Sequence, residues 1–360
     1  MNNDMLCYKS RFVTVVLLLG YTFIHTQLTG IYTDTPLASM VDFSARLPYG
    51  QRLLVPMLVR VLTFLPLKID QLFFLMEWLF ISLFYFALFK LLQQEFKERA
   101  AQLLSWLFIL LLPLMTVINY RFNYGGEATF FYPADSASLF FMATGFLFCL
   151  RSQWFYFIPW VFLATLNRES SFLLVLMIPA LHWRKLSTVF KPIFFALLTY
   201  CFTRLLVLAF LHHVPGSFME WYFRASTHTY FEANLQWLLN EQNIFLFIFC
   251  FAGLPLFWFA FYDYIPLQYR PLRYVVLFHF LVLLLVGNFM EARIFHEIVL
   301  ILYLPVSIAL SRWLTGLQPI CSYTGFIYYI NRYAVLALLI LITIFRQFLD
   351  KGVIWLAHYF

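Results

Sequence analysis

Charged residues are scarce in this sequence. Only 11% of its 360 residues are Asp, Glu, Lys or Arg, whereas 63% are hydrophobic. A soluble domain carries about 25% charged and about 45–50% apolar residues, so this chain has too few polar side chains to cover a water-exposed surface. The composition excludes an ordinary soluble domain and indicates a membrane protein. The formal net charge is +7. The charged residues are spread singly along the chain and form no basic stripe, which excludes a nucleic-acid partner.

Cysteine is also rare, with 5 in the chain. Three of them lie inside apolar runs, and the other two, Cys7 and Cys321, belong to no CxxC motif. This pattern excludes a disulfide framework and a structural zinc site. A small-residue cleavage site is likewise missing after the apolar run 12–20, so we expect an uncleaved first span there.

Long apolar runs fill most of the chain. A transmembrane helix needs about 20 mostly apolar residues, and short polar clusters separate the runs that qualify. We expect spans near residues 12–30, 71–92, 103–119, 134–150, 190–211, 244–262, 274–287, 298–314 and 333–349. No internal repeat or low-complexity linker divides them. The sequence therefore predicts an all-α fold, a polytopic transmembrane helical bundle of about 9–11 spans, formed as one domain over residues 1–360.

Residues 154–183 do not fit a single crossing helix. Two apolar pieces, 154–166 and 171–181, are each too short to cross at about 1.5 Å per residue, and the polar segment 167–170 lies between them. We expect a broken or re-entrant helix pair whose break faces a cavity, because polar groups at membrane depth need protein or water around them. The alternative is one long tilted helix with a snorkelling Arg168.

The basic residues near the N-terminus, Lys9 and Arg11, favour an N-terminus in the cytoplasm. With that orientation, most of the 17 acidic residues fall on or near the outer side. Acidic residues contribute little to topology, so this asymmetry requires another explanation. We infer a polar site on the outer face.

The first outer loop contains Asp34, Asp42, Arg46 and Arg52. Asp42 is a candidate general base, and the two arginines are candidate ligands for phosphate oxygens. The alternative is a set of surface salt bridges and interfacial anchors. The chain near 51–67 is interrupted by charge and proline, which predicts an interfacial helix. A second interfacial stretch is expected near 212–243, where aromatic and charged residues are mixed. This stretch could lie on the membrane surface and cover the site.

The second outer loop contributes two acids, Glu127 and Asp135. Pro133 followed by Asp135 is typical of the first turn of a helix, because the carboxylate meets the positive end of the helix dipole. The same position would also face any cavity at the outer end of that helix. The sequence leaves Asp135 open as a helix-start residue or a catalytic group.

Two further polar clusters lie near the outer side in this topology. One contains Arg168 and Glu169, and the other contains Glu291, Arg293 and His296. Ionisable groups near a membrane usually have partners, so Arg168 is expected to pair with Glu169 or Glu291. Each residue could serve pairing alone, but four clusters on one side favour a substrate site.

One charge falls inside a predicted span. Arg204 is expected to pair with Glu77 or to snorkel.

The many spans, the acidic first outer loop followed by an interfacial helix, and the acid in the second outer loop resemble the GT-C superfamily of integral-membrane glycosyltransferases. The resemblance covers about the first half of the chain and rests on arrangement. It implies a catalytic carboxylate at Asp42, with Asp34 as a competitor, and an assisting acid at Asp135 or Glu127. The paired acidic motif common in that family's first loop is absent, because Asp34 and Asp42 stand apart.

The resemblance implies inverting sugar transfer from a polyprenyl-phosphate-linked donor to a hydroxyl of a glycan, lipid or protein acceptor. The expected location is the outer (periplasmic) face of a bacterial inner (plasma) membrane. A divalent metal stays open, because no ligand motif is recognisable. The alternatives are a transporter or flippase, a polymerase of lipid-linked glycans, and a non-catalytic envelope scaffold.

Overall fold

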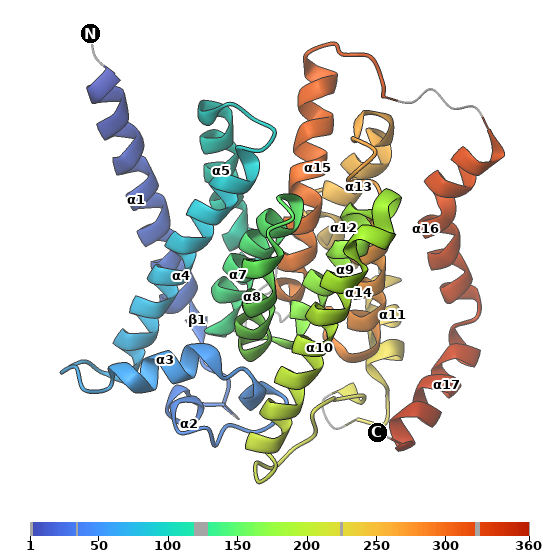
Figure 1. The fold of residues 1–360 in the computed structure, drawn as a ribbon. Helices are drawn as coiled ribbons and strands as arrows, with labels where there is room; N and C mark the ends of the chain where they lie inside the picture. Colours follow the sequence, from blue (N-terminus) through green and yellow to red (C-terminus); the bar gives the residue numbers. More distant parts are fainter. Residues whose placement is uncertain (1–2, 34, 119–128, 224–225, 321–324, 360) are drawn as a thin grey trace. The chain divides into compact units, whose positions relative to one another are not determined.

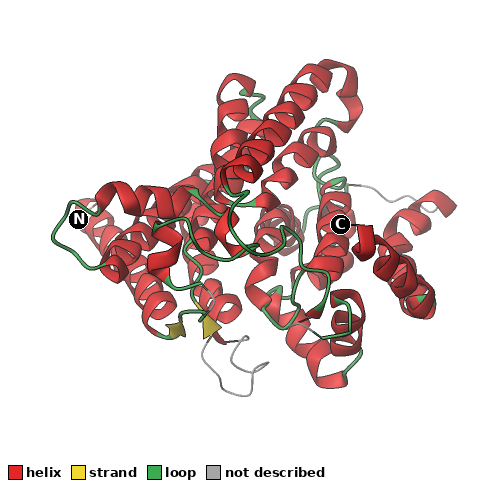
Figure 2. Ribbon diagram, turned by 90° about the horizontal axis from the view of Figure 1, so that it is seen from below, coloured by secondary structure: helices red, strands yellow, loops and turns green. Residues whose placement is uncertain are grey.

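A computed structural model describes residues 3–33, 35–118, 129–223, 226–320 and 325–359. Helices form nearly all of the regular structure in these residues (Figures 1 and 2), as the sequence predicts. The exception is a pair of two-residue strands, β1 (Thr29–Gly30) and β2 (Thr129–Phe130), which pair in parallel. The chain divides into two compact units: residues 1–179 with 185–216, and residues 180–184 with 217–360.

The first unit contains the helices α1 to α5 and α7 to α10. Their bounds are α1 Asn3–Gln27, α2 Leu37–Val41, α3 Leu54–Leu62, α4 Ile69–Leu92, α5 Glu98–Pro113, α7 Ala134–Leu150, α8 Trp154–Asn167, α9 Phe172–Leu181 and α10 Leu186–Phe210, with the last two residues of α9 assigned to the second unit. A short π-helical turn, Leu114–Ile118, continues α5. The most extensive helix packing in this unit joins α4 to α7.

Helix α7 begins where the sequence predicts. Pro133 occupies the N-cap position, and Asp135 lies in the first turn. Proline is tolerated there because the first backbone N–H groups of a helix have no partner inside the helix. The carboxylate of Asp135 is therefore held at the positive end of α7.

The predicted break after residue 166 is present. Helix α8 ends at Asn167, and Arg168 has the extended backbone angles φ −161° and ψ 144°. The chain then makes a single 3₁₀ turn, Glu169–Ser171, before α9 begins. Because Arg168 leaves the helical conformation, α8 and α9 remain separate short helices.

The second unit contains α11 to α17. Their bounds are α11 Tyr230–Leu238, α12 Glu241–Cys250, α13 Leu254–Ala260, α14 Leu272–Val286, α15 His296–Leu314, α16 Phe326–Ile344 and α17 Arg346–Tyr359. Helix α15 is central, since 89% of its most apolar stretch is buried. An apolar helix that is covered all round belongs to a core. Aromatic rings including Phe247, Phe251 and Phe295 pack against it or beside its start, with ring centroids 4.9–5.3 Å apart.

Four helical stretches in the described residues are long and apolar enough to cross a membrane. They are Ile69–Leu92, Glu98–Ile118, Trp183–Phe210 and Ala292–Leu314, and the number rises to six if two bent pairs each form one span. The bent pairs are Gln242–Phe249 with Leu254–Ala260 and Arg332–Ile344 with Arg346–His358, bent by 81° and 80°. The count of about 9–11 spans stays a prediction.

The predicted interfacial stretches also form short helices. Residues 51–67 contain α3, and residues 212–243 contain α11 and the start of α12.

Candidate functional site

The loop between α2 and α3 is hydrogen-bonded to two segments of the first unit that are distant in the sequence. The backbone N–H of Leu53 donates to the carbonyl oxygen of Leu166 near the end of α8, at 2.9 Å. The N–H of Leu47 donates to the carbonyl of Pro215, beyond α10, at 3.1 Å. Backbone hydrogen bonds of this kind fix position regardless of side chain. The loop residues before α3 are thereby brought to the break between α8 and α9.

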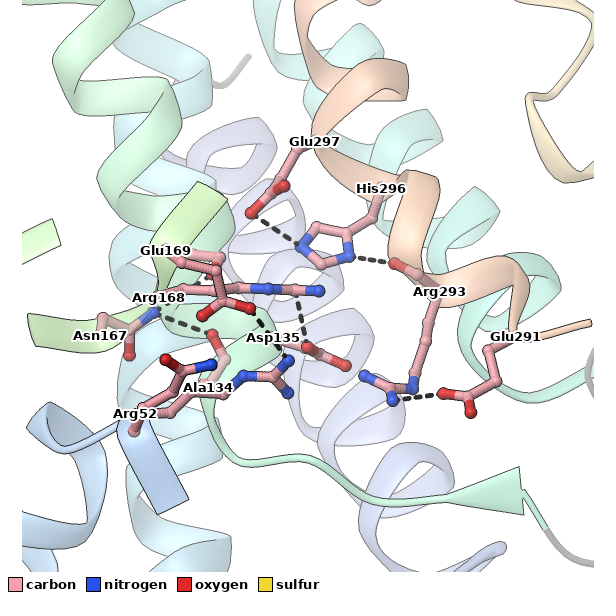
Figure 3. Close-up of polar contacts among 12 residues, drawn as sticks. Arg52, Ala134, Asp135, Asn167, Arg168, Glu169, Glu291, Arg293, His296 and Glu297 are labelled. Atoms are coloured by element: carbon pink, nitrogen blue, oxygen red, sulfur yellow. Dashed lines mark hydrogen bonds and ion pairs between the residues drawn. The ribbon is translucent and has the colours of Figure 1, made fainter. Parts of the chain in front are cut away.

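Arg168 and Asp135 form a buried ion pair at this break (Figure 3). Their side chains are only 6% and 2% exposed, and Arg168 Nη1 lies 3.0 Å from Asp135 Oδ1. One partner is therefore Asp135, the acid at the start of α7, and the charge of Arg168 also acts on Glu169. The expected pairing with Glu169 or Glu291 stays a prediction. Packing of α7 against α8 places the two groups together.

Asn167 connects the end of α8 to α7 through hydrogen bonds of its uncharged side chain. Its Nδ2 donates to the carbonyl oxygen of Ala134 at 3.0 Å and to Oγ of Ser138 at 3.2 Å (Figure 3). The last residue of α8 is thus bound to the first turns of α7. Because buried polar groups are costly without partners, these bonds specify how the break meets α7.

Two more arginines reach the break from other segments. Arg52 Nη2 lies 3.4 Å from Glu169 Oε1 (Figure 3), and Arg204 Nη2 of α10 donates to Oε1 of Gln51 at 2.6 Å. The hydroxyl of Tyr200, also on α10, donates to the backbone carbonyl of Glu169 at 3.1 Å. We refer to Arg52, Asp135, Arg168, Glu169 and Arg204 as the break cluster.

The arginines of the break cluster control the ionisation of Glu169. Burial raises the pKa of this carboxyl. The positive charges of Arg52, Arg168 and Arg204 lower it by a larger amount, so the resulting pKa lies below the ordinary value. Glu169 is therefore an anion at neutral pH, even though its side chain is only 38% exposed. Three guanidinium groups face two carboxylates within the break cluster, so one positive charge is in excess.

Some polar atoms of the break cluster have no hydrogen-bond partner among the described residues. Arg204 Nη1 is a buried donor of this kind, and Glu169 Oε2 is a buried acceptor. A buried donor normally has a partner, and an orphan donor in a native protein calls for an explanation. Guanidinium groups match the oxygens of a phosphate or carboxylate. The arrangement is therefore chemically suited to binding an oxyanion.

Two other candidate residues of the first half of the chain, Asp42 and Arg46, are exposed. Asp42 is exposed at the C-cap of α2, and Arg46 is exposed in the loop that follows. Asp34 and Glu127 lie outside the described residues. The structure thus brings Arg52, Asp135, Arg168 and Glu169 together, while the catalytic role of Asp42 stays a prediction.

The remaining candidates, Glu291, Arg293 and His296, form a group of their own in the second unit (Figure 3). Arg293 is 3% exposed and pairs with Glu291. The Nδ1 of the buried His296 interacts with the carbonyl oxygen of Arg293. Their predicted role in a shared substrate site is not decided by these contacts.

Sequence reasoning missed several neutral or histidine partners. Glu77 of α4 contacts His25 Nδ1 at 2.8 Å and accepts a hydrogen bond from Ser136, and all three are buried. The expected partner of Glu77, Arg204, instead contacts Gln51. In the second unit, Glu297 lies 3.3 Å from His279 Nε2 and 3.9 Å from His296 Nε2. Such partners carry no charge pattern that a sequence could reveal.

Among the residues that the structure describes, no three His, Cys, Asp or Glu side chains are grouped as metal ligands. Comparison with known proteins gives no match to a family model, to a curated protein or to a solved structure.

Proposed function

We propose that this protein is an integral-membrane glycosyltransferase that takes a sugar from a polyprenyl-phosphate-linked donor. One observation carries the proposal: a helix break in an apolar chain gathers Arg52, Arg168 and Arg204 around two carboxylates, with a buried donor of Arg204 left for an external acceptor. A phosphate attached to a lipid is an oxyanion that such a cluster fits. The resemblance to the GT-C superfamily supplies the reaction type.

Membrane insertion is supported by side chains on the outside of α10. Phe190 is 67% exposed, Leu205 64% and Phe202 55%, and only 17% of the helix's most apolar stretch is buried. Large exposed apolar surfaces mark contacts with protein or membrane. We place α10 against lipid, with the break cluster on the outer face of a bacterial inner membrane and the N-terminus in the cytoplasm.

In the proposed mechanism the arginines bind the donor phosphate and stabilise the negative charge that develops as the glycosidic oxygen departs. Asp135 and Glu169 hold the guanidinium groups in place, because each already pairs with an arginine. Asp42 accepts the proton of the acceptor hydroxyl, whose oxygen attacks the anomeric carbon. The bond to the phosphate oxygen breaks, and the lipid phosphate leaves with its electron pair. An exposed carboxylate suits a base that must meet an external acceptor.

The proposal is tested by mass spectrometry of lipid-linked sugars and envelope glycans in source cells. Cells carrying wild-type protein are compared with cells carrying Asp42→Asn or Arg204→Gln at matched abundance. Asp70→Asn is the control, since Asp70 is an exposed acid at the start of α4. We expect both test variants, and not the control, to lose one sugar from a glycan while a polyprenyl-linked donor accumulates.

Other outcomes would favour the alternatives. Accumulation of a complete lipid-linked glycan would indicate a polymerase or a flippase. Unchanged profiles in both test variants would contradict sugar transfer and favour a scaffold.

A further inference from the structure

A second polar feature lies inside the second unit, away from any residue assigned a role above. A partly open cavity of about 390 Å³ is lined by side chains of α12 to α16. Its walls are mostly apolar, and Phe247, Phe251, Phe280, Leu302 and Leu336 are among the residues that line them. Its volume falls in the range of about 300–1,000 Å³ that is typical of small-molecule sites.

Two arginines, Arg273 and Arg332, line the same cavity. The guanidinium group of Arg273 donates to the hydroxyls of Tyr262 at 2.8 Å and Tyr274 at 2.7 Å. Arg332 donates to the hydroxyl of Tyr328 at 2.6 Å and lies 5.3 Å from the ring centroid of Phe259. Hydrogen bonds to tyrosines and contacts with ring faces hold these cations in place.

The charges around these arginines favour an anion. Arg270 stacks on the ring of Tyr262 at 4.5 Å, which adds a third cation beside Arg273 and Arg332. The acid that contacts Arg332 is Asp263, at 3.4 Å. The rings of Tyr262 and Tyr328 have centroids 6.3 Å apart, so the three guanidinium groups gather around one pair of tyrosines. The cavity thus combines apolar walls with a cationic end.

The rim of the cavity is itself apolar. Leu256, Leu336 and Phe259 line it and are 58%, 51% and 38% exposed. Such a rim offers no hydrogen bond to a polar ligand arriving from water, whereas a lipid chain can enter through it sideways from a bilayer. The combination of an apolar entrance and fixed arginines matches the acyl chain and the phosphate of one molecule.

The cationic end is far along the helix from the Glu291–Arg293 pair. Arg273 lies in the first turn of α14, whereas Glu291 follows the other end of that 15-residue helix, which spans about 22 Å. If Arg293 lies near the outer face, the cationic end lies near the cytoplasmic leaflet. Basic pockets between membrane helices on the cytoplasmic side are suited to anionic head groups.

We propose that this cavity binds an anionic phospholipid of the cytoplasmic leaflet, with one acyl chain in the cavity and its phosphate on Arg273 and Arg332. The inference rests on the membrane location proposed above and does not depend on the transfer reaction. The lipid contributes stability to the second unit, because a ligand that binds the folded state alone stabilises it.

The test uses full-length protein in a neutral detergent and measures the melting temperature while dioleoyl-phosphatidylglycerol or dioleoyl-phosphatidylcholine is added. We expect a saturable rise with phosphatidylglycerol and none with phosphatidylcholine. Arg273→Gln is expected to weaken lipid binding and so to raise the half-saturating lipid concentration about tenfold, since charge-assisted hydrogen bonds to phosphate are among the strongest in proteins. Arg312→Gln removes the same charge near the end of α15, outside the cavity lining, and should bind like wild type.

A second variant tests the chain-binding part without altering charge. Val276→Phe adds bulk to a residue that lines the cavity and should also abolish the rise. Equal effects of the two lipids, or an unaltered response in both cavity variants, would overturn the proposal. It would be overturned equally if inorganic phosphate reproduced the rise, which indicates a free anion, or if a polyprenyl phosphate bound more tightly, which assigns the cavity to the sugar donor.

Discussion

The backbone N–H of Leu53 donates to the carbonyl oxygen of Leu166 across a 2.9 Å hydrogen bond. The two residues are adjacent to Arg52 and to Asn167, so this bond joins the end of the loop between α2 and α3 to the helix break. Two regions that are separate polar clusters in the sequence thereby form one group of charges.

The buried pair of Arg168 and Asp135 predicts a large effect of removing one partner. Arg168→Met leaves the Asp135 carboxylate buried without its cation, and loss of one member of a buried ion pair costs about 3–5 kcal/mol. The double variant Arg168→Met with Asp135→Leu should regain most of the lost free energy of unfolding, because neither charge then remains. Denaturant titrations in mild detergent measure both values. A double variant no more stable than Arg168→Met would contradict the pairing.

In the second unit, the uncharged side chain of Asn234 is expected to contribute to the free energy of unfolding. Asn234 of α11 donates from Nδ2 to the carbonyl of Gly287 at 2.7 Å and accepts from the N–H of Phe289 at 3.0 Å. It therefore satisfies the backbone where α14 ends. Asn234→Leu keeps the size and leaves these groups unpaired, so we expect the unfolding free energy to fall by about 1–3 kcal/mol. Gln236→Leu is the matched control, because Gln236 is on the same helix and contacts only Glu232 among the hydrogen bonds described.

The helix break could be predicted because it depends on local chemistry. Two apolar pieces too short to cross the membrane and the polar segment 167–170 are visible in the sequence, as are Pro133 and Asp135 at the start of α7. The partner of Arg168 could not be predicted, since Asp135 is 33 residues away and only the packing of α7 on α8 brings it near. The contact of Arg204 with Gln51 could not be predicted from charge either, because Gln51 is neutral.

Lowering the pH should remove one contribution to the stability of the first unit. The pKa of Glu169 is lower in the folded protein than its ordinary value of 4.5. A depressed folded pKa stabilises the fold above the unfolded pKa, and that stabilisation is lost as the pH falls through the folded pKa. The difference in melting temperature between wild type and Glu169→Gln should be constant near pH 7 and should shrink below about pH 4.5. A difference that grows on acidification would show the opposite shift.

The membrane topology is tested with one cysteine introduced in the loop after α2 and another just after the end of α4. This helix has 24 residues and is about 36 Å long, enough to cross a hydrocarbon core of about 30 Å. Helices α2 and α3 lie where α4 begins (Figure 1). An impermeant maleimide should label Ser44→Cys in intact cells and Gln94→Cys only after permeabilisation, above the background of the native cysteines. The reversed labelling pattern would place the proposed site on the cytoplasmic face.

The roles proposed for Asp42 and Arg204 predict different kinetic defects. With the substrate identified, Asp42→Asn should lower kcat by about 10²–10⁴-fold, the usual contribution of a general base, with little change in KM for the donor. Arg204→Gln should raise that KM, because the buried Nη1 donor would no longer contact the phosphate before and during reaction. Arg151→Gln is the control, since Arg151 is the C-cap of α7, at the opposite end from Asp135. If Asp42→Asn kept full kcat while Arg204→Gln raised KM, the break cluster would remain the donor site and the base would have to be another carboxylate.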